Sequence, residues 1–239
     1  MYRFYQKNPL GFALVSIAAY VVLFSLSDSL SASLHVQKLI TAPVGLLLTL
    51  VLYGFLKKNG LREAYGLCPF RGDSKAFLYF LPLVLLASIN LWNGAALNAS
   101  LPETVLFLVS MLCVGFLEEV IFRGLLLKAL CMDNRRTAIL VSSLTFGIGH
   151  IVNLLNGAEF FPTLLQICYA TAIGFLFCIL FLRGKSLLPC IMTHGVINCL
   201  SLFGVPGSQV MNLVTALAIC GVSIGYALWI LKHTEPEQI

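Results

Sequence analysis

Eight long runs of apolar residues with little or no charge dominate the chain. They cover residues 10–26, 39–56, 76–97, 104–127, 137–155, 160–182, 186–203 and 210–231. A membrane-spanning helix needs roughly 17 to 25 residues, and each run meets that requirement. The runs are apolar on every side, whereas strands of a membrane barrel alternate, so hydrogen bonding of the backbone in lipid requires helices. We therefore predict an all-α polytopic membrane helix bundle with about eight transmembrane helices.

The composition agrees with a membrane protein and argues against a nucleic-acid partner. Apolar residues make up 59% of the 239 residues and charged residues 10%, and the mean hydropathy is +0.94. A soluble domain usually has about 45 to 50% apolar and about 25% charged residues. The net charge of +5 is spread over short gaps, with no basic tail. We expect a lipid bilayer around the chain and no nucleic acid bound to it.

Basic residues occupy every second gap between the runs. They are Arg3, Lys7, Lys57, Lys58, Arg62, Arg71, Lys75, Lys128, Arg135, Arg136, Arg183, Lys185 and Lys232. In the other gaps Lys38 is the only Lys or Arg. By the positive-inside rule the basic gaps face the cytoplasm, which makes both termini cytoplasmic. We expect an integral multi-pass protein of the cell membrane.

We expect a single transmembrane domain over residues 1–239, with a motif-bearing core at 104–203. The first run is longer than the apolar part of a signal peptide, which has about 7 to 15 residues, so we expect it to remain as a helix. The cysteines form no C-x-x-C pair and mostly lie inside apolar runs. A buried thiol behaves as a small hydrophobic group, so no disulfide framework is expected.

Five ionisable side chains lie inside these apolar runs. They are Glu118, Glu119 and Arg123 in FLEEVIFRGLLL, His150 in LTFGIGHIVNLL, and His194 in LPCIMTHGVINCL. An acidic or basic residue at the centre of a membrane helix costs about 2.5 to 3.5 kcal/mol. Side chains that remain at such a cost usually line a buried functional site.

The two adjacent glutamates are expected to differ in role. Glu119 and Arg123 are four residues apart, the spacing at which an acid and a base meet on a helix. Glu118 is rotated from Glu119 by about 100° and lacks such a partner. We therefore expect Glu118 to exchange protons and Glu119, held by Arg123, to support the helix.

The polar residues of the other two runs also share helix faces. Phe146 and His150 are four apart with Asn153 three further on, and His194 and Asn198 are four apart. At 1.5 Å per residue from the basic end of each run, Glu118 lies roughly 14 Å deep, His150 roughly 20 Å, His194 roughly 12 Å and Asn198 roughly 18 Å. These side chains are predicted to occupy one layer and to form a site that opens toward the cytoplasm.

The ordered motifs on three helices resemble the CPBP (ABI) family of intramembrane proteases, which includes the type II CAAX prenyl endopeptidases. The motifs are Glu118-Glu119-x-x-x-Arg123, Phe146-x-x-x-His150 and His194-x-x-x-Asn198. The resemblance implies a peptidase that acts on a peptide or protein at the membrane, in some members a lipidated one. It leaves open whether the role is CAAX processing or the processing of, or immunity to, bacteriocins.

The groups themselves suggest how such a peptidase would work. No Ser, Cys or Lys in this constellation is placed to serve as a covalent nucleophile, so attack by water is favoured. Glu118 with His150 would hold and deprotonate the water, and His194 with Asn198 would donate hydrogen bonds to the oxyanion. Glu119 and Arg123, together with Phe146 and Asn153, would support these four residues.

Several alternatives use the same residues. Glu118, His150 and His194 could bind zinc with an open position for water, although we favour a site without a cofactor. The two histidines could instead ligate haem, or the charges could line an ion path. A catalytically inactive immunity or scaffold protein could bind a peptide in the same cavity. The sequence does not specify the oligomeric state.

Overall fold

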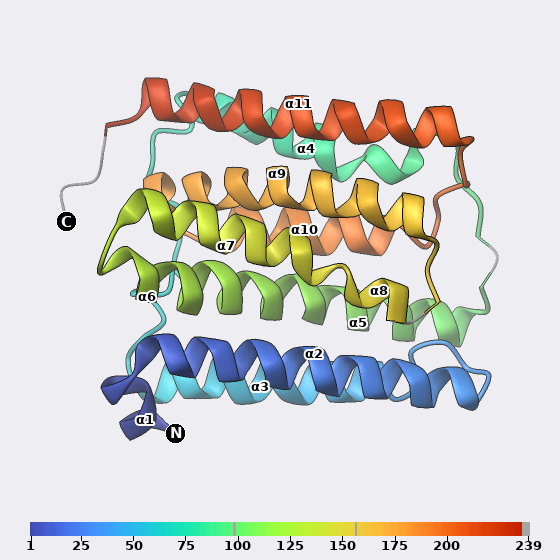
Figure 1. The fold of residues 1–239 in the computed structure, drawn as a ribbon, viewed down its shortest axis with the longest axis horizontal. Helices are drawn as coiled ribbons and strands as arrows, with labels where there is room; N and C mark the ends of the chain where they lie inside the picture. Colours follow the sequence, from blue (N-terminus) through green and yellow to red (C-terminus); the bar gives the residue numbers. More distant parts are fainter. Residues whose placement is uncertain (98, 156, 236–239) are drawn as a thin grey trace.

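The chain folds into helices that run side by side, as Figure 1 shows for the computed structural model. Residues 1–97, 99–155 and 157–235 are described, so the last four residues of the predicted domain 1–239 lie outside them. The α-helices are α1 Tyr2–Lys7, α2 Pro9–Ser33, α3 Thr41–Lys58, α4 Leu81–Ala87, α5 Leu101–Glu118, α6 Leu127–Cys131, α7 Arg135–Gly149, α8 Val152–Leu155, α9 Phe160–Gly184, α10 Leu188–Leu200 and α11 Gln209–His233. The remaining elements are the 3₁₀ turns η1 Leu78–Phe80 and η2 Ile89–Leu91 and the π-helix η3 Glu119–Leu126.

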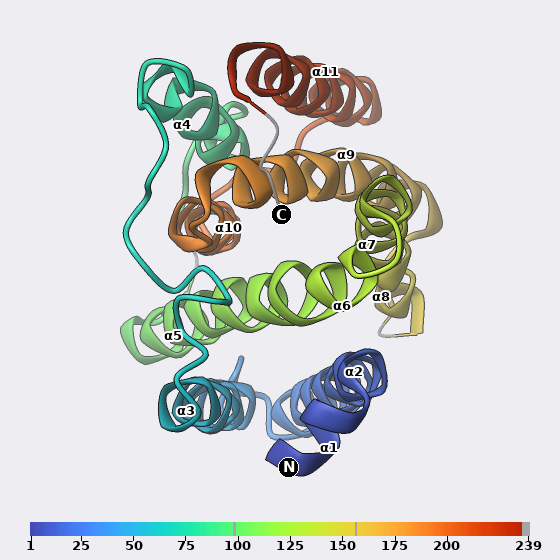
Figure 2. The same cartoon turned by 90° about the vertical axis from the view of Figure 1, so that its left-hand side faces the viewer.

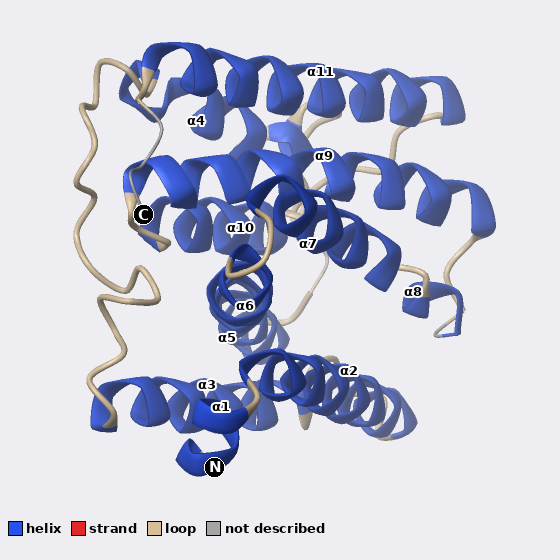
Figure 3. Ribbon diagram, turned by 60° about the vertical axis from the view of Figure 1, so that its left-hand side comes forward, coloured by secondary structure: helices blue, strands red, loops and turns tan. Residues whose placement is uncertain are grey.

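The predicted all-α class is confirmed (Figure 3). Across the described parts of the chain, β pairing is limited to one isolated bridge between Ala95 and Gly204. Six helices among these residues are long and apolar enough to cross a membrane. They are Pro9–Ser33, Thr41–Lys58, Leu101–Cys131, Arg135–Leu155, Phe160–Gly184 and Gln209–His233. The chain is therefore an integral membrane protein.

The other two predicted spans form shorter helices, so the count of eight stays a prediction. They correspond to the apolar helices Leu78–Ala87 and Leu188–Leu200. In the predicted span 76–97, regular α-helix ends at Ala87. The polar side chains that follow form hydrogen bonds that hold the chain in a different course. Ser88 Oγ accepts from the Trp92 indole at 3.0 Å, and Asn90 Nδ2 donates to the Ile197 carbonyl of α10 at 2.6 Å. These bonds fold the chain into η2 and tie it to α10.

The helices form layers in which the predicted core is central (Figure 2). α4 and α11 lie on one outer side, and α2 and α3 lie on the other. Between them, α9 packs against both α7 and α11, and α5 packs against both α3 and α10. α5, α9 and α10 are thereby enclosed between the outer layers, and α7 lies at the edge of the bundle against α9.

The basic gaps gather at one end of the bundle, at the left of Figure 1. This basic end is formed by α1, the end of α3, the α6–α7 and α9–α10 connections and the end of α11. Lys38 lies between α2 and α3 at the opposite end. The arrangement agrees with the predicted alternation, while the assignment of the basic end to the cytoplasm stays a prediction.

Candidate active site

A π-helix carries Glu119 and Arg123 of the first motif, and Glu118 is the last residue of α5 before it. α5 continues directly into η3, where the amide of Leu127 donates to the carbonyl of Phe122, five residues earlier. Every residue from Glu119 to Leu126 is buried. Ser142 of α7 supports this segment, since its hydroxyl donates to the same Phe122 carbonyl at 2.9 Å. π-Helical turns are rare and occur frequently at functional sites.

Glu119 and Arg123 pair as their spacing predicts. Arg123 Nη1 donates to Glu119 Oε1 at 3.0 Å, and both side chains are completely buried. The Arg123 guanidinium also lies 3.9 Å from the centre of the Phe146 ring, a cation–π contact between η3 and α7. Phe146 of the second motif therefore holds the arginine of the first.

Glu119 has a second partner that the sequence did not predict. The Nδ1 atom of His194 lies 2.8 Å from Glu119 Oε1, the distance of a hydrogen bond that the ring donates to the carboxylate. This bond fixes the orientation of the imidazole. Its Nε2 atom then faces Glu118, at 3.7 Å from Glu118 Oε2. A buried carboxylate thus orients the histidine toward the neighbouring carboxylate.

Close packing of two glycines brings these residues together. Gly115 of α5 and Gly195 of α10 lie so near one another that a Cβ atom on Gly115 would be 2.7 Å from the Gly195 backbone nitrogen. Small residues of this kind allow membrane helices to approach closely. The contact is adjacent to His194 and one helical turn before Glu119, so it sets the distance across which their hydrogen bond forms.

Glu118 also has a partner that the sequence did not predict. The Tyr20 hydroxyl of α2 donates to Glu118 Oε1 at 2.6 Å. The sequence predicted only that Glu118 lacks a basic partner, and it did not predict this bond because the two residues are 98 positions apart. The run 10–26 is apolar on all sides, and only the phenol of Tyr20 hinted at such a contact. The glutamate side chain keeps 15% of its surface exposed.

His150 lies where α7 ends. Its Nδ1 atom is 3.1 Å from the Phe146 carbonyl, one turn earlier, so Nδ1–H donates there and Nε2 is left for another partner. The helix stops at Gly149 and resumes as α8, which interrupts the predicted continuous span 137–155. Asn153 of α8 donates from Nδ2 to Gln166 of α9 at 2.9 Å. That bond holds the segment carrying His150 against α9.

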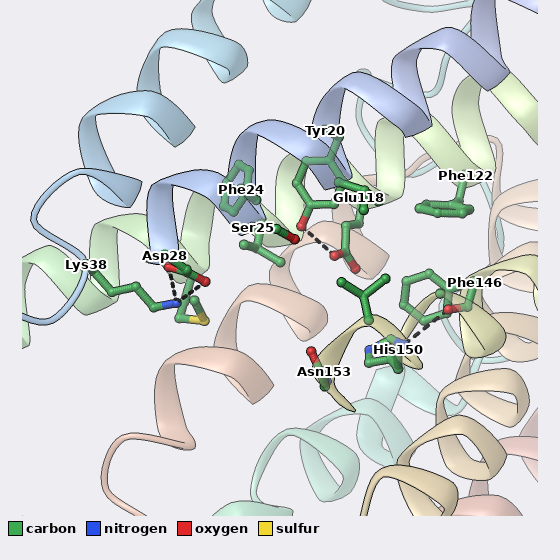
Figure 4. A pocket seen from close by; sticks show the side chains of 15 residues that line it. Tyr20, Phe24, Ser25, Asp28, Lys38, Glu118, Phe122, Phe146, His150 and Asn153 are labelled. Atoms are coloured by element: carbon green, nitrogen blue, oxygen red, sulfur yellow. Dashed lines mark hydrogen bonds and ion pairs between the residues drawn. The ribbon is translucent and has the colours of Figure 1, made fainter. Parts of the chain in front are cut away.

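The four predicted catalytic residues line one cavity. Glu118, His150, His194 and Asn198 surround a volume of about 350 Å³, together with Phe146 and Asn153. No hydrogen bond engages the Asn198 side chain within the described ranges. A smaller cavity of about 170 Å³ shares Glu118 and His150 and extends to Tyr20 of α2 (Figure 4).

The cavities lead away from the basic end, contrary to the predicted opening. The α2 side of the smaller cavity reaches Asp28 and Lys38, near the opposite end of the bundle (Figure 4). A third cavity, of about 310 Å³, shares Tyr169 and Ser201 with the central one and continues to Gly207 in the α10–α11 connection. If the basic end is cytoplasmic, the site therefore opens to the other side.

Tight packing explains why the site is closed toward the basic end. A hydrophobic cluster fills the region between the polar groups and the basic gaps, and it includes Tyr65, Leu125, Leu126, Leu127, Phe181 and Leu187. The turn at Gly66 holds it in place: this glycine has a φ of +70°, and its carbonyl accepts from the Leu187 amide at 2.8 Å. A side chain at position 66 would also collide with the Phe181 ring. No sequence pattern distinguished this buried cluster from lipid-facing apolar residues.

The donor set does not fit the zinc alternative. Over residues 1–97, 99–155 and 157–235, no three His, Cys, Asp or Glu side chains are gathered in a way that could hold a metal ion. Glu118, His150 and His194 line one cavity, but they are not among side chains close enough together to form a metal site.

One comparison with known proteins found a similarity, over the central part of the chain. Residues 100–200 match the model of a family described as type II CAAX prenyl endopeptidase Rce1-like. No curated protein and no solved structure matched the chain. The matched segment contains all three motifs, from Glu118 to Asn198, whereas Tyr20 lies outside it.

Proposed function

On the premise that residues 100–200 belong to the Rce1-like family of type II CAAX prenyl endopeptidases, we propose that this chain hydrolyses a peptide bond within the membrane by means of activated water. One observation carries the proposal. Glu118, His150, His194 and Asn198 come from three separate helical segments and line one cavity of about 350 Å³. Acceptors for a water proton and a donor for an oxyanion are thereby placed within one space.

Glu118 is the general base. A water molecule in the cavity gives a proton to Glu118 Oε2 while its oxygen bonds to the carbonyl carbon of the substrate. His150 contributes an acceptor from Nε2, because its Nδ1–H is engaged by the Phe146 carbonyl. The tetrahedral intermediate then collapses with cleavage of the C–N bond, and the proton held by Glu118 passes to the leaving amine.

Asn198 and His194 stabilise the oxyanion. The Asn198 amide is a permanent donor, and its side chain lines the same cavity as Glu118. His194 Nε2 donates when the ring carries a second proton, and the bond from Nδ1 to Glu119 holds the ring in place. Donors placed where negative charge develops are usually the largest single contribution to such reactions.

The substrate is a peptide or protein held at the membrane, with lipidated proteins as the first class to test. Among the described residues that line the central cavity there is no Lys or Arg, and the polar lining beyond the four catalytic residues consists mainly of amides and hydroxyls such as Asn90, Asn153 and Ser201. Such groups hydrogen-bond an extended backbone without requiring charge on it. The family description makes a farnesylated CAAX peptide the natural first probe.

The decisive experiment compares purified wild-type protein with Glu118→Gln, both in detergent or liposomes. We expect the wild type to release a C-terminal fragment from a farnesylated CAAX peptide and the variant to release none. In parallel, the termini of membrane peptides would be compared between cells that carry either form. Two outcomes would contradict a peptidase: equal release of fragments by both proteins, or no release by either protein in both the peptide assay and the cells. The second of these outcomes would favour the non-catalytic peptide-binding alternative.

A further inference from the structure

We propose that Tyr20 is a positioning residue for the reaction, which holds Glu118 so that one defined oxygen receives the proton of water. The inference rests on the proposed function and adds a residue to it. Tyr20 belongs to α2, outside the segment 100–200 that matches the family model. A helix beyond the motif-bearing core thereby completes the catalytic site.

The hydrogen bond between Tyr20 and Glu118 is short and well enclosed. Tyr20 Oη lies 2.6 Å from Glu118 Oε1, and the tyrosine is 8% exposed. Its ring packs against that of Phe24, one turn later on α2, with 4.6 Å between the ring centres. Hydrogen bonds from a hydroxyl to a carboxylate are among the stronger ones, and this ring has little room to turn away.

This bond makes the two oxygens of Glu118 unequal. Oε1 accepts from Tyr20, while Oε2 faces His194 Nε2 at 3.7 Å. The terminal torsion of a glutamate is broad, so an unheld carboxylate would sample many orientations. With Oε1 fixed, Oε2 is the oxygen presented to a water that also meets His150 and His194. Tyr20 therefore acts through Glu118 and does not itself need to touch the substrate.

The tyrosine ring also separates two cavities of different character. On one side it lines the smaller cavity with Glu118 and His150. On the other it lines an apolar groove of about 330 Å³ between α2 and α3, with Phe12, Leu48 and Leu117. Tyr20→Phe keeps this partition and removes only the hydroxyl. The substitution therefore tests the hydrogen bond while the ring still separates the two cavities.

A buried tyrosine hydroxyl forms a hydrogen bond whether or not it has a role in catalysis. Two other buried tyrosines therefore serve as controls. Tyr226 is 4% exposed and donates to the Phe77 carbonyl at 2.6 Å. Tyr65 is 6% exposed and bonds Tyr5 Oη at 2.7 Å. Neither lines a cavity that contains Glu118. Substitution of either by Phe removes a comparable bond far from the carboxylate.

The first test measures turnover of the farnesylated peptide by the wild type, Tyr20→Phe and Tyr226→Phe. We expect Tyr20→Phe to lower kcat by about tenfold to a hundredfold with KM within twofold, the loss that follows a small misplacement of a catalytic group. Tyr226→Phe should keep the wild-type kcat. A Tyr20→Phe enzyme as fast as Tyr226→Phe would overturn the positioning role. A wild type inactive on this and every other substrate would remove the proposed function, and with it this role.

The second test is independent of activity and examines the contact itself. Tm is measured for Tyr20→Phe, Glu118→Gln and the double variant, with Tyr226→Phe paired with Glu118→Gln as the control. Residues in direct contact give non-additive effects, whereas distant ones add. We expect the first pair of Tm shifts to be non-additive and the control pair to add. Additive shifts in both pairs would refute the contact even if the peptidase is active.

Discussion

Two neighbouring carboxylates lie in two different regions of this molecule. Glu118 projects into the cavity region, where it keeps 15% of its side chain exposed and meets Tyr20 and His194. Glu119 lies in the closed core behind it, completely buried between Arg123 and His194. A rotation of one residue along the helix therefore places one acid beside space for water and the other where space is absent.

The difference shows how a membrane protein can keep two acidic side chains in its interior at acceptable cost. A buried charge is tolerated only where it is paired and hydrogen-bonded. Glu119 meets this condition through Arg123, and it then orients His194. Glu118 accepts one hydrogen bond from the neutral Tyr20 hydroxyl, and its other oxygen, Oε2, lies 3.7 Å from His194 Nε2. The core region fixes the positions of the side chains, and in the proposed function the cavity region supplies the reacting carboxylate.

The largest expected effect comes from substituting the glutamate of each region in turn and comparing the two variants. Glu118→Gln should lower kcat by at least about 100-fold to 10,000-fold, because a general base is lost, and should leave the folded yield and Tm close to wild type. Glu119→Gln is the matched control, and it should reduce the folded yield, because it leaves Arg123 without a counter-charge. Peptide turnover, size-exclusion profiles and Tm measure these outcomes. A Glu118→Gln protein that fails to fold would break the comparison.

Removal of Arg123 tests the core region directly. Arg123→Ala leaves Glu119 buried and uncompensated, a change that costs about 3 to 5 kcal/mol in buried pairs. The folded yield and Tm should fall sharply. Lys38→Ala is the control, since Lys38 pairs with Asp28 at 2.9 Å with both side chains partly exposed, and such pairs contribute about 0 to 1 kcal/mol. An Arg123→Ala protein that accumulates normally and loses only turnover would mean that Glu119 and Arg123 belong to the catalytic machinery.

Asn198→Ala tests the proposed oxyanion donor, which lines the same cavity as Glu118. Asn198→Ala should lower kcat by about 100-fold to 1,000-fold with KM nearly unchanged, the usual cost of one missing donor. Because the Asn198 side chain makes no hydrogen bond to any other described residue, Tm should change little. A rise in KM at constant kcat would instead assign Asn198 to substrate binding.

The sequence predicted those features that depend on local spacing. The apolar runs identified the six long helices, and the four-residue spacing correctly paired Glu119 with Arg123. Depth counting also placed Glu118, His150, His194 and Asn198 in one layer, and these four residues line one cavity. Each of these inferences uses only helix geometry, which the chain carries in its own order.

What the sequence missed depends on contacts between distant segments. The bonds from Tyr20 to Glu118 and from His194 to Glu119 join residues 98 and 75 positions apart. The π-helix η3 reflects a shifted hydrogen-bond register that hydropathy does not encode. The closed basic end was also missed, because residues such as Leu125 and Leu187 are as apolar as those that face lipid. In a membrane protein, apolarity alone does not separate core from surface.

The smallest expected effect concerns metal. Because no three possible ligand side chains are gathered around a metal position in the described parts of the chain, purified protein should contain no stoichiometric zinc by elemental analysis, and activity should survive a chelator. Asn198→Asp sharpens this test. Without a metal, a carboxylate at 198 repels the developing oxyanion, so the variant should be as slow as Asn198→Ala or slower. At a zinc centre the added anionic oxygen could act as a ligand and preserve part of the activity. One zinc per chain, with activity lost to chelation and restored by zinc, would show that the cavity region binds a catalytic metal, and the proposal of a peptidase would stand.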